Sequence, residues 1–148
     1  PIIHSKYQNE TVYFFNGKAV KQYTDTPDSI KKLEDYEVFV FGSNLNGNHA
    51  GGAAKLAANK FGAKDGIGEG LTGQSYAFPT LDKDVRKVTP EALKASVDAL
   101  IKCAGENTHK VFLLTKVGTG IAGFSEDEIK PYFDRRDMPA NIIKPKHW

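Results

Sequence analysis

The sequence has one cysteine, no long hydrophobic run and almost no net charge, and each absence excludes a class of protein. Cys103 is the only cysteine among 148 residues, so no intrachain disulfide can form and we expect a reducing compartment. The longest apolar runs have the length of a strand, far below the roughly 20 residues that span a bilayer. No basic and apolar leader is visible in PIIHSKYQNETVYFF. We therefore expect a cytoplasmic protein without a membrane partner.

Clustered basic residues and metal-ligand spacings are also missing. The formal net charge is +2 and the lysines are dispersed, so there is no strong nucleic-acid signal. His4, His109 and His147 are scattered and show no HxxxH-like spacing, so neither a metal site nor a cofactor is expected. No GK[ST] sequence occurs, which excludes a P-loop.

The composition and the order of elements predict one α/β domain over residues 1–148. Hydrophobic residues make up 40% and charged residues 26% of the chain, as in ordinary globular proteins. VYFF-NG-KAVKQY, around Asn16-Gly17, predicts an N-terminal β-hairpin. Beyond it, strands alternate with helices, which predicts a three-layer α/β/α domain with a mixed, largely parallel central sheet.

Two glycine-rich junctions dominate the sequence. The first follows the apolar strand Val38–Phe41 and precedes a helix expected over His49–Phe61. The second follows an apolar strand expected over Val111–Val117 and precedes a helix with the capping-box pair Ser125 and Glu128. Loops at the carboxyl ends of neighbouring parallel strands face one crevice, and helix N-termini offer unpaired N–H groups there.

Glycines at such junctions let the backbone turn its N–H groups toward phosphate oxygens. The simpler interpretation is a tight strand–helix connection that needs a positive φ, and for one such loop alone it explains the glycines as well as a phosphate site does. Two such loops that face one crevice favour the ligand site. The segment GTGIAG also has the spacing G-x-G-x-x-G, but it falls in the last quarter of the chain with no second βαβ unit behind it. A Rossmann dinucleotide site is therefore excluded.

Residue by residue, the chain resembles the macro domain family, α/β modules that bind ADP-ribose and in some branches hydrolyse it from modified macromolecules. GTGIAGF is similar to the diphosphate loop of that family, and YEVFVFGSNLNGNHAGGAA to its buried strand and first loop. A weaker match places Asp28 near the acid that reads the adenine amino group. The resemblance assigns ligand binding to Asp28, Asn44, Gly51, Gly52, Gly118, Thr119, Gly120, Ile121, Ala122, Gly123 and Phe124.

Within that resemblance, the residues have different parts. The backbone N–H groups of the second loop would hold the diphosphate, Phe124 would pack on the distal ribose, and Asn44 would contact the proximal ribose. Two positions depart from the family pattern: Phe41 replaces the first of two loop asparagines, and Ala54 stands where the deacylating branches carry an acid. An alanine cannot act as an acid or a base, which argues against hydrolysis by that route.

Three residues are candidates for catalysis, each with a simpler alternative. His49 could act as a general base or a phosphate donor, or be an ordinary histidine at a helix start. Glu69, between glycines, could reach the crevice as a carboxylate base or be solvated. Asn44 could orient the ribose or serve the turn geometry alone. The mixed-charge loop with Asp82, Asp84 and Arg86 is interpreted as solvated.

The sequence therefore predicts an ADP-ribose-type nucleotide-binding domain. Hydrolysis of an ADP-ribosyl or phosphoester bond is a further activity that the family would allow. The alternatives are a non-catalytic module that recognises ADP-ribosylated partners, and a degenerate site.

Overall fold

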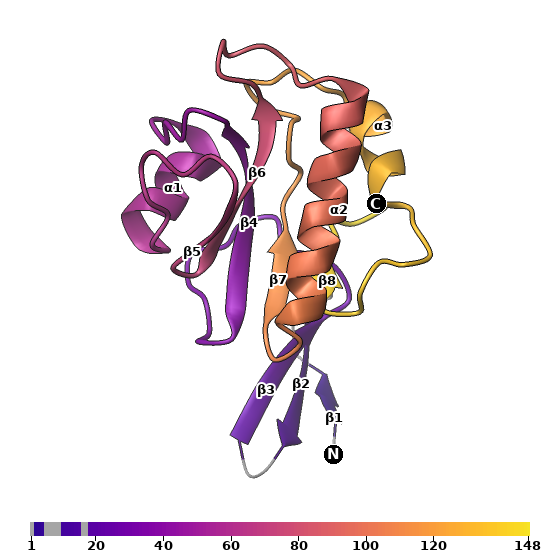
Figure 1. The fold of residues 1–148 in the computed structure, drawn as a ribbon. Helices are drawn as coiled ribbons and strands as arrows, with labels where there is room; N and C mark the ends of the chain where they lie inside the picture. The colour runs from indigo at the N-terminus through magenta and orange to yellow at the C-terminus, as the bar shows by residue number, and fades with distance from the viewer. Residues whose placement is uncertain (1, 5–9, 16–17) are drawn as a thin grey trace.

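A computed structural model of the chain describes residues 2–4, 10–15 and 18–148. The fold is α/β, with a mixed five-stranded sheet in the order β5-β6-β4-β7-β8 (Figure 1). Four strands run parallel and β5 runs antiparallel to β6. The strands are β4 (Glu37–Asn44), β5 (Gly70–Thr72), β6 (Ser75–Leu81), β7 (Val111–Leu114) and β8 (Ile142–Ile143).

Three helices and one 3-10 turn accompany this sheet: α1 (Gly52–Lys60), α2 (Pro90–Glu106), α3 (Glu126–Ile129) and η1 (Lys130–Phe133). Helix α2 begins at the pair Thr89-Pro90. The Thr89 side chain accepts the Ala92 N–H, and Pro90 has no N–H that would need an acceptor in the first turn. Helix α3 has the predicted capping box of Ser125 and Glu128. Pro131 lies where the α-helical turn gives way to η1.

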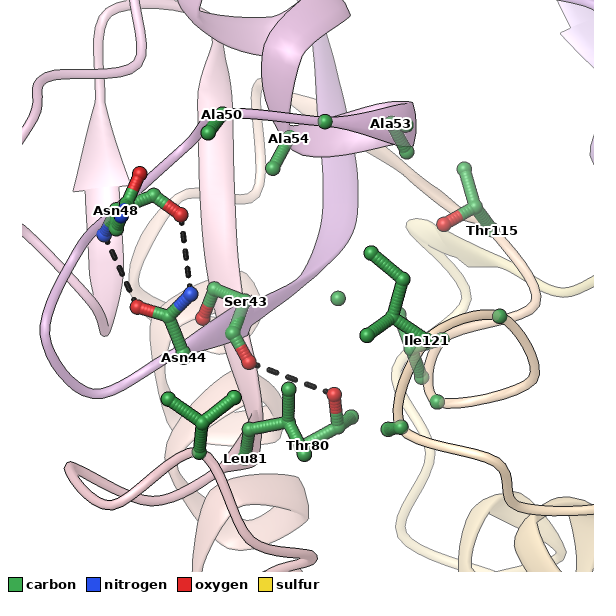
Figure 2. A pocket seen from close by; sticks show the side chains of 18 of the residues that line it. Ser43, Asn44, Asn48, Ala50, Ala53, Ala54, Thr80, Leu81, Thr115 and Ile121 are labelled. Carbon is green, nitrogen blue, oxygen red and sulfur yellow. Dashed lines mark hydrogen bonds between the residues drawn. The ribbon is translucent and has the colours of Figure 1, made fainter.

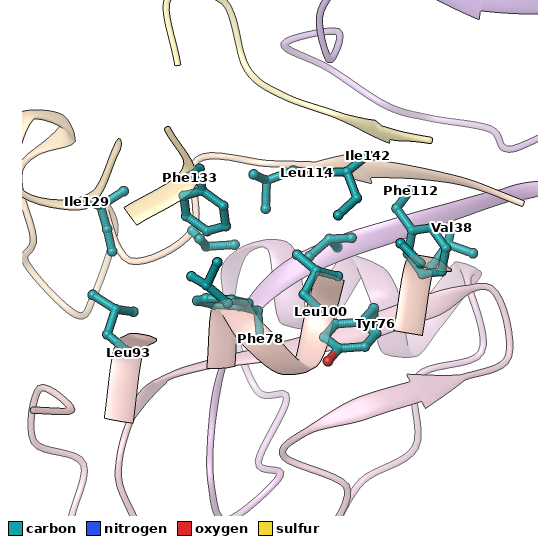
Figure 3. Close-up of a cluster of buried hydrophobic side chains, with 14 of the residues drawn as sticks. Val38, Tyr76, Phe78, Leu93, Leu100, Phe112, Leu114, Ile129, Phe133 and Ile142 are labelled. Carbon is teal, nitrogen blue, oxygen red and sulfur yellow. The ribbon is translucent and has the colours of Figure 1, made fainter. Parts of the chain in front are cut away.

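The side chains of β4 alternate between two apolar clusters. Phe39 and Phe41 belong to a cluster that includes α1, whereas Val38 and Val40 belong to a larger cluster that includes α2, α3 and η1. Figure 3 shows the larger cluster, in which Phe78 and Phe133 lie with ring centroids 5.5 Å apart. A strand buried on both faces explains why the apolar run of β4 has no polar alternation.

A second sheet, of three antiparallel strands, precedes the main sheet in the chain. It comprises β1 (Ile2–His4), β2 (Glu10–Phe15) and β3 (Lys18–Tyr23). Strands β2 and β3 pair in register, with Phe15 opposite Lys18. Figure 1 shows this sheet extending away from the five-stranded sheet. The expected turn residues Asn16-Gly17 lie outside the described residues.

Two element boundaries differ from the expected ones. The helix expected from His49 begins at Gly52, because His49 is drawn into the α1-side core and Gly52 turns the chain with φ of 58°. The strand expected to reach Val117 ends at Leu114. The chain turns there, since the Val117 N–H donates to the Thr115 carbonyl oxygen at 2.8 Å. Within the described part of the chain, no helix is long and apolar enough to cross a bilayer.

Candidate functional site

A cavity of about 420 Å³ lies where β4 and β7 end (Figure 2). The two strands are parallel neighbours, so the segments that leave their carboxyl ends meet at one edge of the sheet. We call residues 45–51, between β4 and α1, the first loop, and residues 115–125, between β7 and α3, the second loop. Both loops line the cavity. Its volume falls within the range of about 300–1,000 Å³ that is typical of small-molecule sites.

The first loop is held by side chains. The Asn44 amide group donates from Nδ2 to the Asn48 carbonyl oxygen and accepts the Asn48 N–H at Oδ1, both at 3.0 Å. These are the two dashed contacts between Asn44 and Asn48 in Figure 2. Asn46 donates from Nδ2 to the Lys83 carbonyl oxygen at 2.7 Å, which ties the loop to the turn after β6. Asn44 therefore serves the loop geometry, whatever else it contacts.

A neighbouring glycine-rich segment supports the first loop from outside the cavity. The Gly66 N–H donates to the Gly47 carbonyl oxygen at 2.9 Å, and Ser43 Oγ donates to the Gly68 carbonyl oxygen at 2.6 Å. Gly47 has φ of 70°, and a Cβ there would lie 2.4 Å from the carbonyl carbon of Gly66. The two backbones are thus in direct contact, and Gly66 and Gly68 support the loop instead of lining the cavity.

Helix α1 begins at the cavity without a side-chain cap. Its N-cap is Gly51, which is extended and offers no side-chain acceptor. Among the described residues, no acceptor pairs with the N–H groups of Gly52, Ala53 and Ala54, and all three residues line the cavity. A helix N-terminus in this state carries a partial positive charge and unsatisfied donors, which favour an anion.

The second loop is closed mainly by its own backbone. The Gly123 N–H donates to the Gly120 carbonyl oxygen at 3.0 Å and the Phe124 N–H to the Gly118 carbonyl oxygen at 2.9 Å. Within the described chain, the N–H groups of Gly118, Gly120, Ile121 and Ala122 have no acceptor, and these residues line the cavity. The loop therefore presents a second group of unpaired donors opposite α1.

One lysine accounts for the charged side chains at the cavity. Lys116 lines the cavity, and its Nζ lies 3.4 Å from Glu126 Oε2. Both side chains are about half exposed. The Trp148 indole N–H, which donates to Glu126, and then Lys116 hold the pKa of Glu126 below its usual value. Among the described lining residues there is no Asp, Glu, His, Cys or Tyr. The described residues also hold no group of three potential metal ligands.

Seven of the residues that the sequence assigns to the site line the cavity: Asn44, Gly51, Gly52, Gly118, Gly120, Ile121 and Ala122. Thr119 and Gly123 belong to the second loop but are not lining residues. Thr119 Oγ1 donates to the Lys116 carbonyl oxygen at 2.8 Å, and Gly123 has φ of 77°. Phe124 is half-buried against the larger apolar cluster, and Lys87 Nζ lies 4.7 Å from its ring centroid.

His49 lies in the core beneath the first loop. It is 5% exposed, its ring meets Phe41 edge-on at 5.2 Å, and Nε2 lies 3.0 Å from the Lys64 carbonyl oxygen. Because a carbonyl oxygen only accepts, Nε2 carries the proton and donates. Nδ1 is buried and has no partner among the described residues. The structure therefore does not bring His49 into the cavity, and Phe41 fills the space beside it.

Glu69 and Asp28 also lie outside the cavity lining. Glu69 is exposed and accepts from Ser96 Oγ of α2 at 3.4 Å, on the α2 side of the sheet. Asp28 is exposed and follows Thr26, which pairs with Pro145 just after β8. Of the three catalytic candidates, the cavity includes Asn44 and no other.

Several lining residues were not singled out from the sequence. Thr80, Leu81 and Val85 come from β6 and the turn after it, and Thr115 from the end of β7. The segment QSYAFPT contains most of β6, and nothing in its residue pattern indicates that it borders the cavity. The charges of the turn that carries Val85 indicate a solvated loop. Its one apolar residue, Val85, is the feature that could have indicated contact with a ligand.

Comparisons of the chain with models of known protein families, with curated proteins and with solved structures gave no match. The resemblance to macro domains therefore stays a prediction that rests on the two loop segments.

Proposed function

We propose that the chain binds ADP-ribose or a related nucleotide diphosphate in the cavity between the two loops. The observation that carries the proposal is the convergence of two groups of unpaired backbone donors on one cavity. One group is the first turn of α1 and the other is Gly118, Gly120, Ile121 and Ala122. Phosphate oxygens are acceptors with negative charge, so they satisfy such donors and the α1 dipole together.

The charge of the cavity supports the same ligand class. Lys116 is the one ionisable side chain among the described lining residues, so no carboxylate there repels an anion. The unpaired N–H groups number more than a single phosphate needs, which favours a diphosphate over inorganic phosphate. In this proposal the second loop holds the diphosphate, and the fold is a macro-domain-like three-layer α/β/α arrangement with an N-terminal β-hairpin.

A second candidate function is recognition without hydrolysis. Ala54 lines the cavity, and the resemblance to macro domains puts the water-activating acid of the deacylating branches at that position. The described lining residues include no carboxylate or imidazole that could act as a base. A module that recognises ADP-ribosylated partners needs the donors of the cavity and no base. Incubation with an ADP-ribosylated protein distinguishes the two, because release of ADP-ribose requires catalysis and retention of the modified protein does not.

The direct test is isothermal titration with ADP-ribose, ADP and NAD. We expect micromolar binding, with ADP-ribose tighter than ADP. Failure of all three to bind at millimolar concentration would contradict the proposal.

Two variants separate a lost site from a lost fold. Gly51→Asp places a carboxylate at the N-cap of α1, where the backbone is extended and no described atom lies within 4 Å of a new Cβ. We expect unchanged or slightly higher stability, because Asp caps helices well, and more than tenfold weaker anion binding. Gly120→Val likewise meets open space and should block the second loop. Gly105→Val, also in open space but on α2, is the matched control.

A further inference from the structure

The most exposed large apolar side chains of the described chain border the cavity. Four such residues are exposed: Leu45 by 38%, Ile67 by 40%, Val85 by 59% and Ile121 by 84%. The two highest values belong to Val85 and Ile121, and both of these residues line the cavity. Exposed apolar groups gathered beside a cavity are typical of a ligand-contacting surface, whereas scattered ones need no explanation.

The backbone of Val85 is held in a conformation that its side chain disfavours. Its φ is 60°, and a β-branched residue in the left-handed region is rare. The turn imposes this conformation: Asp82 Oδ1 accepts the N–H groups of Asp84 and Arg86, at 2.8 and 3.0 Å. The Val85 N–H donates to the Asp82 carbonyl oxygen at 3.1 Å. Asn or Gly would fit the turn better, so the presence of valine indicates a use for its side chain.

Unpaired polar groups lie next to this apolar surface. Asn46 is tied to the Val85 turn through its bond to Lys83, yet its Oδ1 accepts from no described residue. The Asn48 side-chain amide likewise has no partner in the described chain, and both residues line the cavity. A nucleobase has apolar faces and polar edges, which match aliphatic side chains and free amides respectively. An alkyl chain offers these two exposed amides neither a donor nor an acceptor.

We propose that Val85 and Ile121 form an apolar clamp that receives the base of the bound nucleotide, with Asn46 and Asn48 at its polar edge. This inference rests on the proposed function and adds the two residues that select a nucleotide over other diphosphates. Valine at this left-handed position then lowers the stability of the fold and raises the affinity for the nucleotide.

The experiment compares ADP, pyrophosphate and butyl diphosphate by isothermal titration, on the wild-type chain and on three variants. Val85→Asn relieves the backbone and removes the Val85 apolar contact, and Ile121→Ser removes the Ile121 contact while keeping the backbone N–H. Ile67→Ser is the control, because Ile67 is exposed but outside the cavity lining. For each variant, the melting temperature is measured as well.

We expect the wild-type chain to bind ADP more tightly than the other two ligands. In Val85→Asn the ADP-to-pyrophosphate affinity ratio should fall about tenfold while the melting temperature stays or rises, because a lost apolar contact of this size corresponds to one decade in affinity. Ile121→Ser should lower the ratio similarly, and Ile67→Ser should leave it as it is.

Three outcomes would overturn the clamp while leaving the diphosphate site intact. They are equal wild-type affinities for ADP and pyrophosphate, butyl diphosphate bound as tightly as ADP, and an unaltered ratio in Val85→Asn. Absence of binding by all three ligands to the wild-type chain would instead contradict the proposed function, and the clamp with it.

Discussion

The two loops at the cavity reach the same edge of the sheet by different means. The first is held by side chains: Asn44 bonds twice to Asn48, and Asn46 and His49 reach carbonyl oxygens outside the loop. The second is held chiefly by backbone bonds among its own residues and leads into a capped helix. Asparagines in one loop thus supply structure, whereas glycines in the other leave backbone donors unpaired. Two loops at the same edge of the sheet therefore differ in what holds them in shape.

The largest expected loss of stability comes from a substitution in the first loop. Gly47→Ala adds a Cβ that would lie 2.4 Å from the Gly66 backbone at a φ of 70°, so one backbone or the other must move. We expect the free energy of unfolding to fall by about 3 kcal/mol or more. Gly51→Ala in the same loop meets open space at an extended φ, and as a poorer N-cap it should lower the free energy of unfolding by about 1 kcal/mol or less. Urea denaturation of both variants measures the difference. Equal stability of the two would mean that the loop does not pack on Gly66.

An intermediate effect is expected for the side chains that close each loop. Asn44→Ala removes two hydrogen bonds and should cost about 1–2 kcal/mol of unfolding free energy. Thr119→Val removes the one bond from Thr119 Oγ1 to Lys116, and the backbone bonds of the second loop remain. Its cost should be about 0.5 kcal/mol. If the same denaturation measurement gave a larger loss of unfolding free energy for Thr119→Val than for Asn44→Ala, side chains would matter more for the second loop than for the first.

The smallest effect concerns pH and the helix that follows the second loop. Glu128 accepts the Ser125 N–H, and this backbone bond first, then the Ser125 side chain, lowers the pKa of Glu128 from its usual 4.5. Because the folded pKa is depressed, the stabilisation is present above about pH 4.5 and is lost as pH falls through the folded value. Glu128→Gln keeps a capping side chain and should remove this part of the acid dependence, measured as melting temperature against pH. An identical acid profile in both proteins would exclude the contribution. Helix α1, capped by Gly51, has no equivalent group.

Much of the fold follows from local patterns. The unbroken apolar run of β4 requires burial on both faces, and the Thr89-Pro90 and Ser125–Glu128 pairs set two helix starts within one residue. The position of both glycine-rich loops after buried parallel strands also predicted that they would share a cavity, and both line it. Each of these inferences depends on periodicity or capping, which are properties of a few consecutive residues.

The remaining site residues depend on contacts that no local pattern encodes. The composition of the first loop did not distinguish a histidine facing the cavity from His49 packed on Phe41. Likewise, Glu69 lies beside α2, and Phe124 packs on the larger apolar cluster. The positions of these side chains depend on packing between residues that are far apart in the chain.

The sequence by itself determined that this is an α/β chain with two glycine-rich strand–helix junctions, because buried strands, caps and tight turns are encoded by neighbouring residues. The tertiary structure alone decided which groups line the cavity. It placed unpaired N–H groups of α1 and of the second loop at the same cavity, and it brought Val85 there from a charged turn. Strand order and side-chain packing set these positions, and both depend on the burial of the whole sheet.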